Sequence, residues 1–105
     1  MTMKLSVIGG GSWGTALAHH MARRGQDVLL WALEEEVAQG VEREHRNPLF
    51  LSDLELDKSL RATSDLDAAT DFSETWLWVV PVQHSRSVMK RLAHKVSQEN
   101  VLISA

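Results

Sequence analysis

Three glycines near the amino terminus have the spacing G-x-G-x-x-G. They are Gly9, Gly11 and Gly14, and they separate an apolar run, Lys4–Ile8, from a helical pattern over Ser12–Arg24. The apolar run predicts a strand that is buried on both faces. A strand, a glycine turn and a helix in this order direct the unpaired N–H groups of the helix start toward a diphosphate. The spacing therefore predicts a binding site for the pyrophosphate of a dinucleotide.

Each glycine has a separate task in such a turn. Gly9 permits the sharp turn off the strand, Gly11 lets the backbone approach the pyrophosphate, and Gly14 lets the helix pack closely on the sheet. Ala18 and Ala22 continue the same small-residue face. The expected contacts to the cofactor diphosphate are the residues of the whole turn: Gly9, Gly10, Gly11, Ser12, Trp13 and Gly14.

The same glycines have to be weighed against three other interpretations. A P-loop needs Lys and Ser/Thr after its last glycine, where this chain has Thr15-Ala16, so hydrolysis of a nucleoside triphosphate is not expected. A methyltransferase motif usually begins with an acid at the end of the first strand, where Ile8 stands. A glycine turn with no ligand is disfavoured, because three glycines in register after a buried strand have little packing advantage.

A run of acids predicts the choice of cofactor. Glu34 stands 20 residues after Gly14, where a carboxylate accepts hydrogen bonds from the adenosine ribose, and Glu35 and Glu36 follow it. A 2′-phosphate would face three negative charges there, and the nearest downstream arginine is Arg43. We therefore expect NAD, with NADP not excluded. The alternative, that the acids only complement a helix dipole, stays open mainly for Glu35 and Glu36.

Short apolar runs alternate with helical segments along the rest of the chain, which is typical of βαβ units. The fold class predicted is α/β, a Rossmann-type doubly wound parallel sheet, expected to be truncated at its C-terminal edge. Trp31, Trp76 and Trp78 are expected in the core, and Phe50 and Phe72 as packing residues. Further strands are predicted over Asp27–Ala32, Leu60–Thr63, Trp76–Val80 and Val101–Ser104, and further helices over Glu34–His45, Ser64–Ala69 and Gln83–Val96.

Composition disfavours several other classes of function. The 105 residues, 44% of them hydrophobic, suffice for one domain, and a formal charge of −3 disfavours a nucleic-acid partner. With no cysteine, and with His19 and His20 pointing in different directions on a helix, no metal site is expected. Because no apolar run approaches the roughly 20 residues that span a bilayer, we expect a cytoplasmic protein without a membrane span. The residues expected to face solvent include Glu44, His45 and His94.

Several further segments occur in a distinctive order. The glycine turn contains Ser12-Trp13-Gly14, and an acidic helix start follows Leu30-Trp31. Three more segments are Asn47-Pro48-Leu49-Phe50-Leu51, Leu60-Arg61-Ala62-Thr63-Ser64-Asp65-Leu66 and Val79-Val80-Pro81-Val82-Gln83. Together they resemble the N-terminal domain of NAD(P)-dependent glycerol-3-phosphate dehydrogenases, over nearly the whole chain.

The resemblance implies roles for residues outside the glycine turn. Leu33 would lie beside the adenine, where bacterial NADP-using members often have Arg or His, and Leu33-Glu34-Glu35 is similar to the NAD-linked eukaryotic type. Pro81 and His84 would approach the nicotinamide half, with His84 as a cofactor contact and not a general base. Two departures, Val82 for a common Ser or His and Ser52-Asp53 for Pro-Gly, leave details of these loops open.

The resemblance also implies a reaction and a division of the chain. The full-length enzyme would interconvert glycerol 3-phosphate and dihydroxyacetone phosphate, a small phosphorylated triose, by hydride transfer. The family's catalytic lysine and substrate ligands would lie after residue 105, in a helical C-terminal domain. Residues 1–105 are therefore expected to be the NAD(P)-binding domain, which binds cofactor and contains no catalytic residue. A homodimer is left open.

Two alternatives to this function remain. One is the N-terminal domain of a different two-domain dehydrogenase, of the hydroxyacyl or ketopantoate type, which the substrate of the full-length protein would distinguish. The other is a nucleotide-sensing module without catalysis, which would bind NADH and act on no phosphorylated triose.

Overall fold

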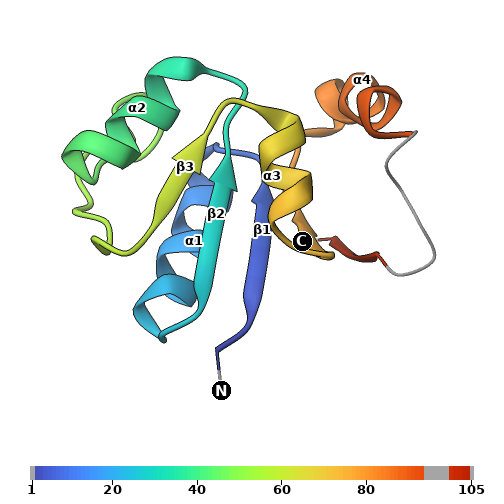
Figure 1. Cartoon of the computed structure of the whole chain (residues 1–105). Coiled ribbons are helices and arrows are strands. Elements are labelled where there is room, and N and C mark those ends of the chain that lie inside the picture. Colours follow the sequence, from blue (N-terminus) through green and yellow to red (C-terminus); the bar gives the residue numbers. More distant parts are fainter. Residues whose placement is uncertain (1, 94–99, 105) are drawn as a thin grey trace.

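A computed structural model describes residues 2–93 and 100–104 of the chain. Within these residues, five parallel strands form one sheet in the order β3-β2-β1-β4-β5. Four helices accompany them (Figure 1). The strands are β1 (Lys4–Ile8), β2 (Asp27–Trp31), β3 (Arg61–Thr63), β4 (Thr75–Trp78) and β5 (Val101–Ser104). The helices are α1 (Ser12–Arg23), α2 (Glu35–Glu44), α3 (Leu66–Phe72) and α4 (Val82–Leu92).

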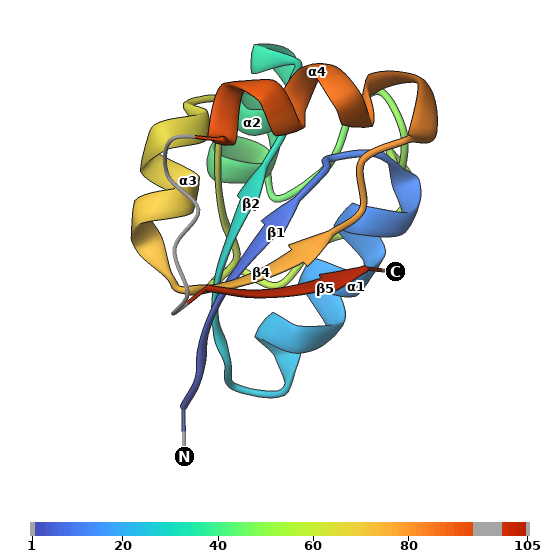
Figure 2. The same ribbon diagram turned by 90° about the vertical axis from the view of Figure 1, so that its right-hand side faces the viewer.

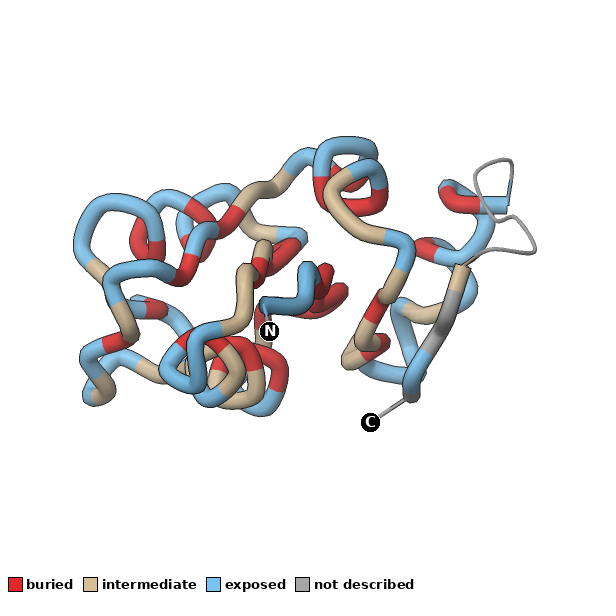
Figure 3. The backbone as a smooth tube through the Cα atoms, turned by 60° about the horizontal axis from the view of Figure 1, so that its bottom comes forward, coloured by how far each residue is buried: buried red, intermediate tan, exposed pale blue. Residues whose placement is uncertain are grey.

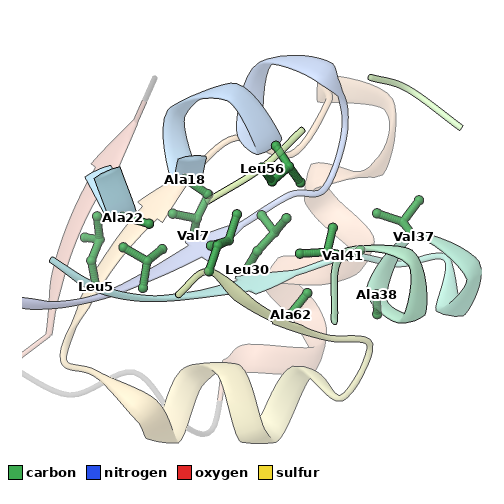
Figure 4. Close-up of a cluster of buried hydrophobic side chains, with 13 residues drawn as sticks. Leu5, Val7, Ala18, Ala22, Leu30, Val37, Ala38, Val41, Leu56 and Ala62 are labelled. Atoms are coloured by element: carbon green, nitrogen blue, oxygen red, sulfur yellow. The ribbon is translucent and has the colours of Figure 1, made fainter. Parts of the chain in front are cut away.

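Helices cover both faces of this sheet. Figure 2 shows α1 and α3 on opposite sides of the strands, with α4 beyond the ends of the strands at the top of the view. One buried cluster combines β1, β2, α1 and α2, and Figure 4 shows Ala18 and Ala22 of α1 beside Leu5 and Val7 of β1. A second cluster lies on the other face, with Ile8, Leu66 and Val88 among its members. The predicted Rossmann-type α/β fold is confirmed.

The central strand β1 is buried over Leu5–Ile8, as its unbroken apolar run predicts. Successive side chains of a strand point to opposite faces, so Val7 joins the first cluster and Ile8 the second. Ser6 also points to the second face, where its hydroxyl donates a hydrogen bond of 2.6 Å to the Ala69 carbonyl of α3. Figure 3 shows buried residues alternating with exposed ones along the turns of the helices.

Three of the four tryptophans are buried, as predicted, and each indole N–H has an acceptor. The Trp31 and Trp76 indoles donate to the carbonyls of Ser64 and Ser73 at 3.1 and 2.7 Å. Trp78 donates to the Ser85 hydroxyl at 3.0 Å. Because a buried N–H without a partner is costly, these bonds let the large rings contribute their full apolar area to the core.

Strand β4 ends at Trp78, two residues before the predicted end at Val80. Its neighbour β1 ends opposite, at Ile8, and turns away at Gly9. After a last hydrogen bond of 2.9 Å from the Val79 N–H to the Ile8 carbonyl, the chain has no strand beside it on that side. The glycine turn therefore shortens the strand that passes next to it.

Helix boundaries differ from the prediction by small amounts. Helix α3 ends at Phe72 and not at Ala69, and the Asp65 carboxylate caps it by accepting from the N–H groups of Asp67 and Ala68. Gly25, with φ of 91°, follows the end of α1 as expected. Helix α4 is described to Leu92, so the predicted continuation to Val96, and His94, lie outside the described residues.

The α2–β3 region contains one contact between a helix and the sheet edge, and one histidine whose burial differs from the sequence prediction. The Glu42 carboxylate accepts a hydrogen bond of 2.7 Å from the N–H of Ala62, in the strand that ends the sheet on that side among the described residues. His45 was expected to face solvent, but it is half-buried, and its Nδ1 is buried without a hydrogen-bond partner. It ends α2 in the left-handed conformation, with φ of 58°.

A histidine joins α1 to the long segment between α2 and β3. The Asp57 N–H donates to His19 Nδ1 at 2.9 Å, so this nitrogen has to be unprotonated. Burial, and then the charge of Arg23, lower the pKa of His19, against the opposing effect of the Asp57 carboxylate. The half-buried His19 thus favours its neutral form in the folded protein, whereas His20 beside it is exposed.

We expect this contact to weaken in acid. The unfolded chain protonates His19 at a higher pH than the folded chain, so the free energy of unfolding falls as the pH drops below about 6.5. Urea unfolding of wild type and His19→Ala at pH 7.5 and 5.5 measures this, and the pH-dependent loss should be smaller in the variant. His20→Ala is the control and should lose nearly as much as wild type, because His20 is the smallest of the contributions to the lowered pKa of His19. An equal loss in all three proteins would contradict the assignment to His19.

Candidate functional site

A cavity of about 420 Å³ opens at the carboxyl ends of the strands. Loops that follow β1, β2 and β4 form much of its wall, together with the start of α1 and the end of β2. Three residues of α4 and one residue of the α2–β3 segment complete it. Its lining consists of Gly9, Gly10, Gly11, Ser12, Trp13, Trp31, Leu33, Glu34, Phe50, Val79, Val80, Pro81, Gln83, His84 and Val88.

The position of this cavity follows from the strand order. Strand β1 lies between β2 and β4, and the chain leaves β1 toward β2 first and reaches β4 only later. At such a reversal the loops after the neighbouring strands separate and leave a crevice at the carboxyl edge of the sheet. The cavity therefore lies where open α/β sheets bind their ligands.

The surrounding protein requires three glycines of the turn, so the expectation that glycines in this register have little packing advantage was wrong. Gly9 has φ of 131°, and a Cβ there would lie 2.5 Å from the Val79 carbonyl oxygen. A Cβ on Gly14 would overlap the carbonyl oxygen of Gly9, and one on Gly10 would lie 2.5 Å from Cβ of Ala32. The turn, α1 and the neighbouring strands are therefore in backbone contact, as predicted for Gly9 and Gly14.

Gly11 is different, because a Cβ there would meet no atom within 4 Å. Its φ of −74° is open to any residue, so neither conformation nor packing explains a glycine here. It precedes the first residue of α1, and no side chain caps this helix end. The helix start thus presents uncapped N–H groups and the positive end of the helix dipole beside the space that Gly11 leaves open.

Nine of the ten residues predicted for the site line this one cavity. Gly14 does not line the cavity, because it packs against the carbonyl of Gly9. Trp13 and Leu33 are 59% and 52% exposed, which is unusual for large apolar side chains. Glu34 is the only one of the three neighbouring acids that lines the cavity, since Glu35 and Glu36 border a separate hollow with Arg43.

Phe50 is a cavity residue that the sequence analysis missed. It was expected to be a packing residue, but it is 44% exposed and lines the cavity. It belongs to an irregular segment without periodicity, so no pattern predicted its direction. The available signal was an aromatic residue in the Asn-Pro-x-Phe-Leu segment.

Asn47 is a second residue whose role the sequence did not reveal. It is fully buried, and its amide Nδ2 donates to the Gly10 carbonyl at 2.9 Å and to the Thr15 hydroxyl at 2.8 Å. Its Oδ1 accepts from the N–H groups of Leu49 and Phe50 at 3.2 and 3.1 Å. One side chain thus connects the glycine turn to the segment that carries Phe50.

Residues 2–93 and 100–104 contain neither a metal site nor a membrane-spanning helix. No group of three or more histidine, aspartate or glutamate side chains is placed to hold a metal ion there. No helix in that part of the chain has both the length and the apolarity to cross a membrane.

The family model described as NAD-dependent glycerol-3-phosphate dehydrogenase N-terminus matches residues 4–105. The chain belongs to this family. A relative named glycerol-3-phosphate dehydrogenase [NAD(P)+] from Nitratidesulfovibrio vulgaris is 47% identical over 103 residues, which are 98% of this chain and 31% of the relative. The family match favours the glycerol-3-phosphate type over the hydroxyacyl and ketopantoate types that the sequence left open.

Solved structures of this family agree with the fold. The glycerol-3-phosphate dehydrogenase of Coxiella burnetii superposes with a TM-score of 0.88 at 30% identity, over 97% of this chain and 31% of that one. The enzyme of Saccharomyces cerevisiae superposes with a TM-score of 0.90 at 25% identity, over 100% and 33%. The chain thus spans about a third of the length of the relatives it matches.

Alanine substitutions of Gly14 and Gly11 should differ in how much they lower the stability of the protein. Gly14→Ala places a methyl group against the Gly9 carbonyl and should lower the free energy of unfolding by about 1–3 kcal/mol. Gly11→Ala places the same group in open space and should change it by less than about 1 kcal/mol. Urea unfolding of both variants measures the difference, and equal losses would show that the turn is packed differently.

Proposed function

We propose that this chain is the cofactor-binding domain of a glycerol-3-phosphate dehydrogenase and that it binds the diphosphate of NAD(H) across the glycine turn. The observation that carries the proposal is Gly11, which lacks a side chain where the protein itself would allow one. A diphosphate against the backbone explains this glycine, because a methyl group would hold the phosphates away from the N–H groups of α1.

The lining residues divide into three groups along the cavity. The glycine turn, Ser12 and Trp13 would hold the diphosphate, with the start of α1 supplying N–H donors. Leu33 and Glu34, after β2, would contact the adenosine end. Pro81 and His84, after β4, would contact the nicotinamide end, where the bound cofactor supplies or accepts a hydride.

The wall after β2 supports NAD over NADP. Glu34 alone of the three acids lines the cavity, and its carboxylate makes no capping hydrogen bond to α2. It is therefore available to accept hydrogen bonds from ribose hydroxyls and would repel a 2′-phosphate. Leu33 beside it supplies no positive charge to offset that repulsion.

The full-length protein is proposed to interconvert sn-glycerol 3-phosphate and dihydroxyacetone phosphate, as the names of its relatives describe for them. The residues of this chain would bind and orient the cofactor and shield one side of it from water. Substrate binding and catalysis would belong to a further domain, so residues 1–105 alone are expected to bind NADH without turnover. The homodimer and the cytoplasmic location stay predictions.

Gly11→Ala tests the proposed diphosphate contact. The added methyl group should weaken NADH binding by at least about tenfold, through lost charge-assisted hydrogen bonds, with little change in stability. Titration of NADH against tryptophan fluorescence in the full-length protein measures the dissociation constant, and urea unfolding supplies the control. Wild-type affinity in the variant would refute the contact. Wild-type protein that binds NADH but does not reduce dihydroxyacetone phosphate would favour a nucleotide-sensing module.

Glu34→Gln tests the choice of cofactor. Wild type should bind NADH more tightly than NADPH, and the variant should reduce that preference by about tenfold, because a hydrogen bond to a charged group is worth roughly 1.5–3 kcal/mol. Glu35→Gln is the matched control, since it removes the same charge from a residue outside the cavity, and it should keep the preference. Tighter binding of NADPH by wild type, or equal effects of the two variants, would contradict the role of Glu34.

A further inference from the structure

The buried amide of Asn47 uses both of its ends. Its Nδ2 donates to the Gly10 carbonyl and the Thr15 hydroxyl, and its Oδ1 accepts from the N–H groups of Leu49 and Phe50. A buried amide with all of these partners is held in one orientation, because rotating it would leave both ends without hydrogen bonds. Asn47 therefore connects the glycine turn to the cavity wall at Phe50 in one fixed orientation.

The bond to Gly10 also orients the next peptide group. All peptide bonds described are trans, so the carbonyl of Gly10 and the N–H of Gly11 point in opposite directions from one planar group. Holding the Gly10 carbonyl toward the buried Asn47 thus directs the Gly11 N–H away from the interior. Gly11 lines the cavity, and its N–H is one of the donors that the proposed diphosphate site requires.

The backbone that carries Asn47 is itself held closely. A Cβ on Gly40 of α2 would lie 2.6 Å from Cδ of Pro48 and 2.8 Å from the Arg46 carbonyl oxygen. The segment on both sides of Asn47 therefore packs directly on the backbone of α2. This contact limits how far the backbone of Asn47 can move. Its side chain therefore holds the turn in a defined position.

We propose that Asn47 is a positioning residue for cofactor binding. It sets the orientation of the Gly11 N–H and, through the other end of the same amide, the position of Phe50. It does not line the cavity, and it acts through these two residues. The inference rests on the proposed function, because it concerns the affinity of the same site.

Asn47→Ala, compared with Ser6→Ala, tests this role in the full-length protein. Ser6 is the matched control because it is also fully buried and its hydroxyl bonds a main-chain carbonyl, that of Ala69, away from the cavity. Both variants should lower the urea midpoint of unfolding. Asn47→Ala should weaken NADH binding by about tenfold or more, and Ser6→Ala by less than twofold.

A second pair of variants gives a test that does not require Asn47→Ala to fold. Thr15→Val keeps the shape of the side chain and removes the hydroxyl, which accepts from Asn47 at 2.8 Å and itself donates a longer bond of 3.4 Å to the Gly10 carbonyl. Thr15→Ser keeps this hydroxyl. Thr15→Val should weaken NADH binding about threefold, and Thr15→Ser should restore an affinity close to that of wild type.

The outcomes separate this inference from the proposed function. Unchanged NADH affinity in a folded Asn47→Ala, or an equal loss in Ser6→Ala, would show a merely structural role and overturn the inference alone. If Asn47→Ala does not fold, equal affinities of Thr15→Val and Thr15→Ser would overturn it. A wild-type protein that fails to bind NADH would overturn the proposed function, and this inference with it.

Discussion

The contact between Gly14 and the Gly9 carbonyl is the constraint on which the rest of the site depends. With no side chain between them, α1 begins directly beneath the end of β1. The close passage of Val79 over Gly9 brings the chain that leaves β4 to the same point. The uncapped helix end and two strand ends therefore meet around one turn. The site is formed first by backbone, and side chains complete its walls.

The cavity wall that α4 forms depends on tryptophans that hold this helix to the sheet. The Trp78 indole bonds the Ser85 hydroxyl, and the Arg91 guanidinium lies 6.0 Å from the centre of the Trp31 ring. Val88 and Leu92 of α4 are buried in the same cluster as both rings. The two large rings, which pack in the core, thus also fix the helix that carries Gln83 and His84 along the cavity.

The sequence predicted the parts of the structure that depend on local pattern. The glycine spacing, the buried strand β1 and the position of Glu34 after β2 are each set by a few neighbouring residues, and they were found. Asn47 was missed because its role depends on a bond to Gly10, 37 residues away in sequence, and Phe50 because its place at the cavity depends on the segment that Asn47 holds. The end of β4 was misplaced for a similar reason, since it is set by where β1 ends and not by the apolar run Trp76–Val80.

The bond from Ala62 to the Glu42 carboxylate has a consequence for how the molecule meets other chains. An outer strand with free N–H groups invites pairing with another polypeptide, and such pairing is a common route to aggregation. Here a charged side chain from α2 occupies a donor of β3 that a foreign strand would need. One N–H on that flank of the sheet is therefore not free to pair with a strand of another molecule.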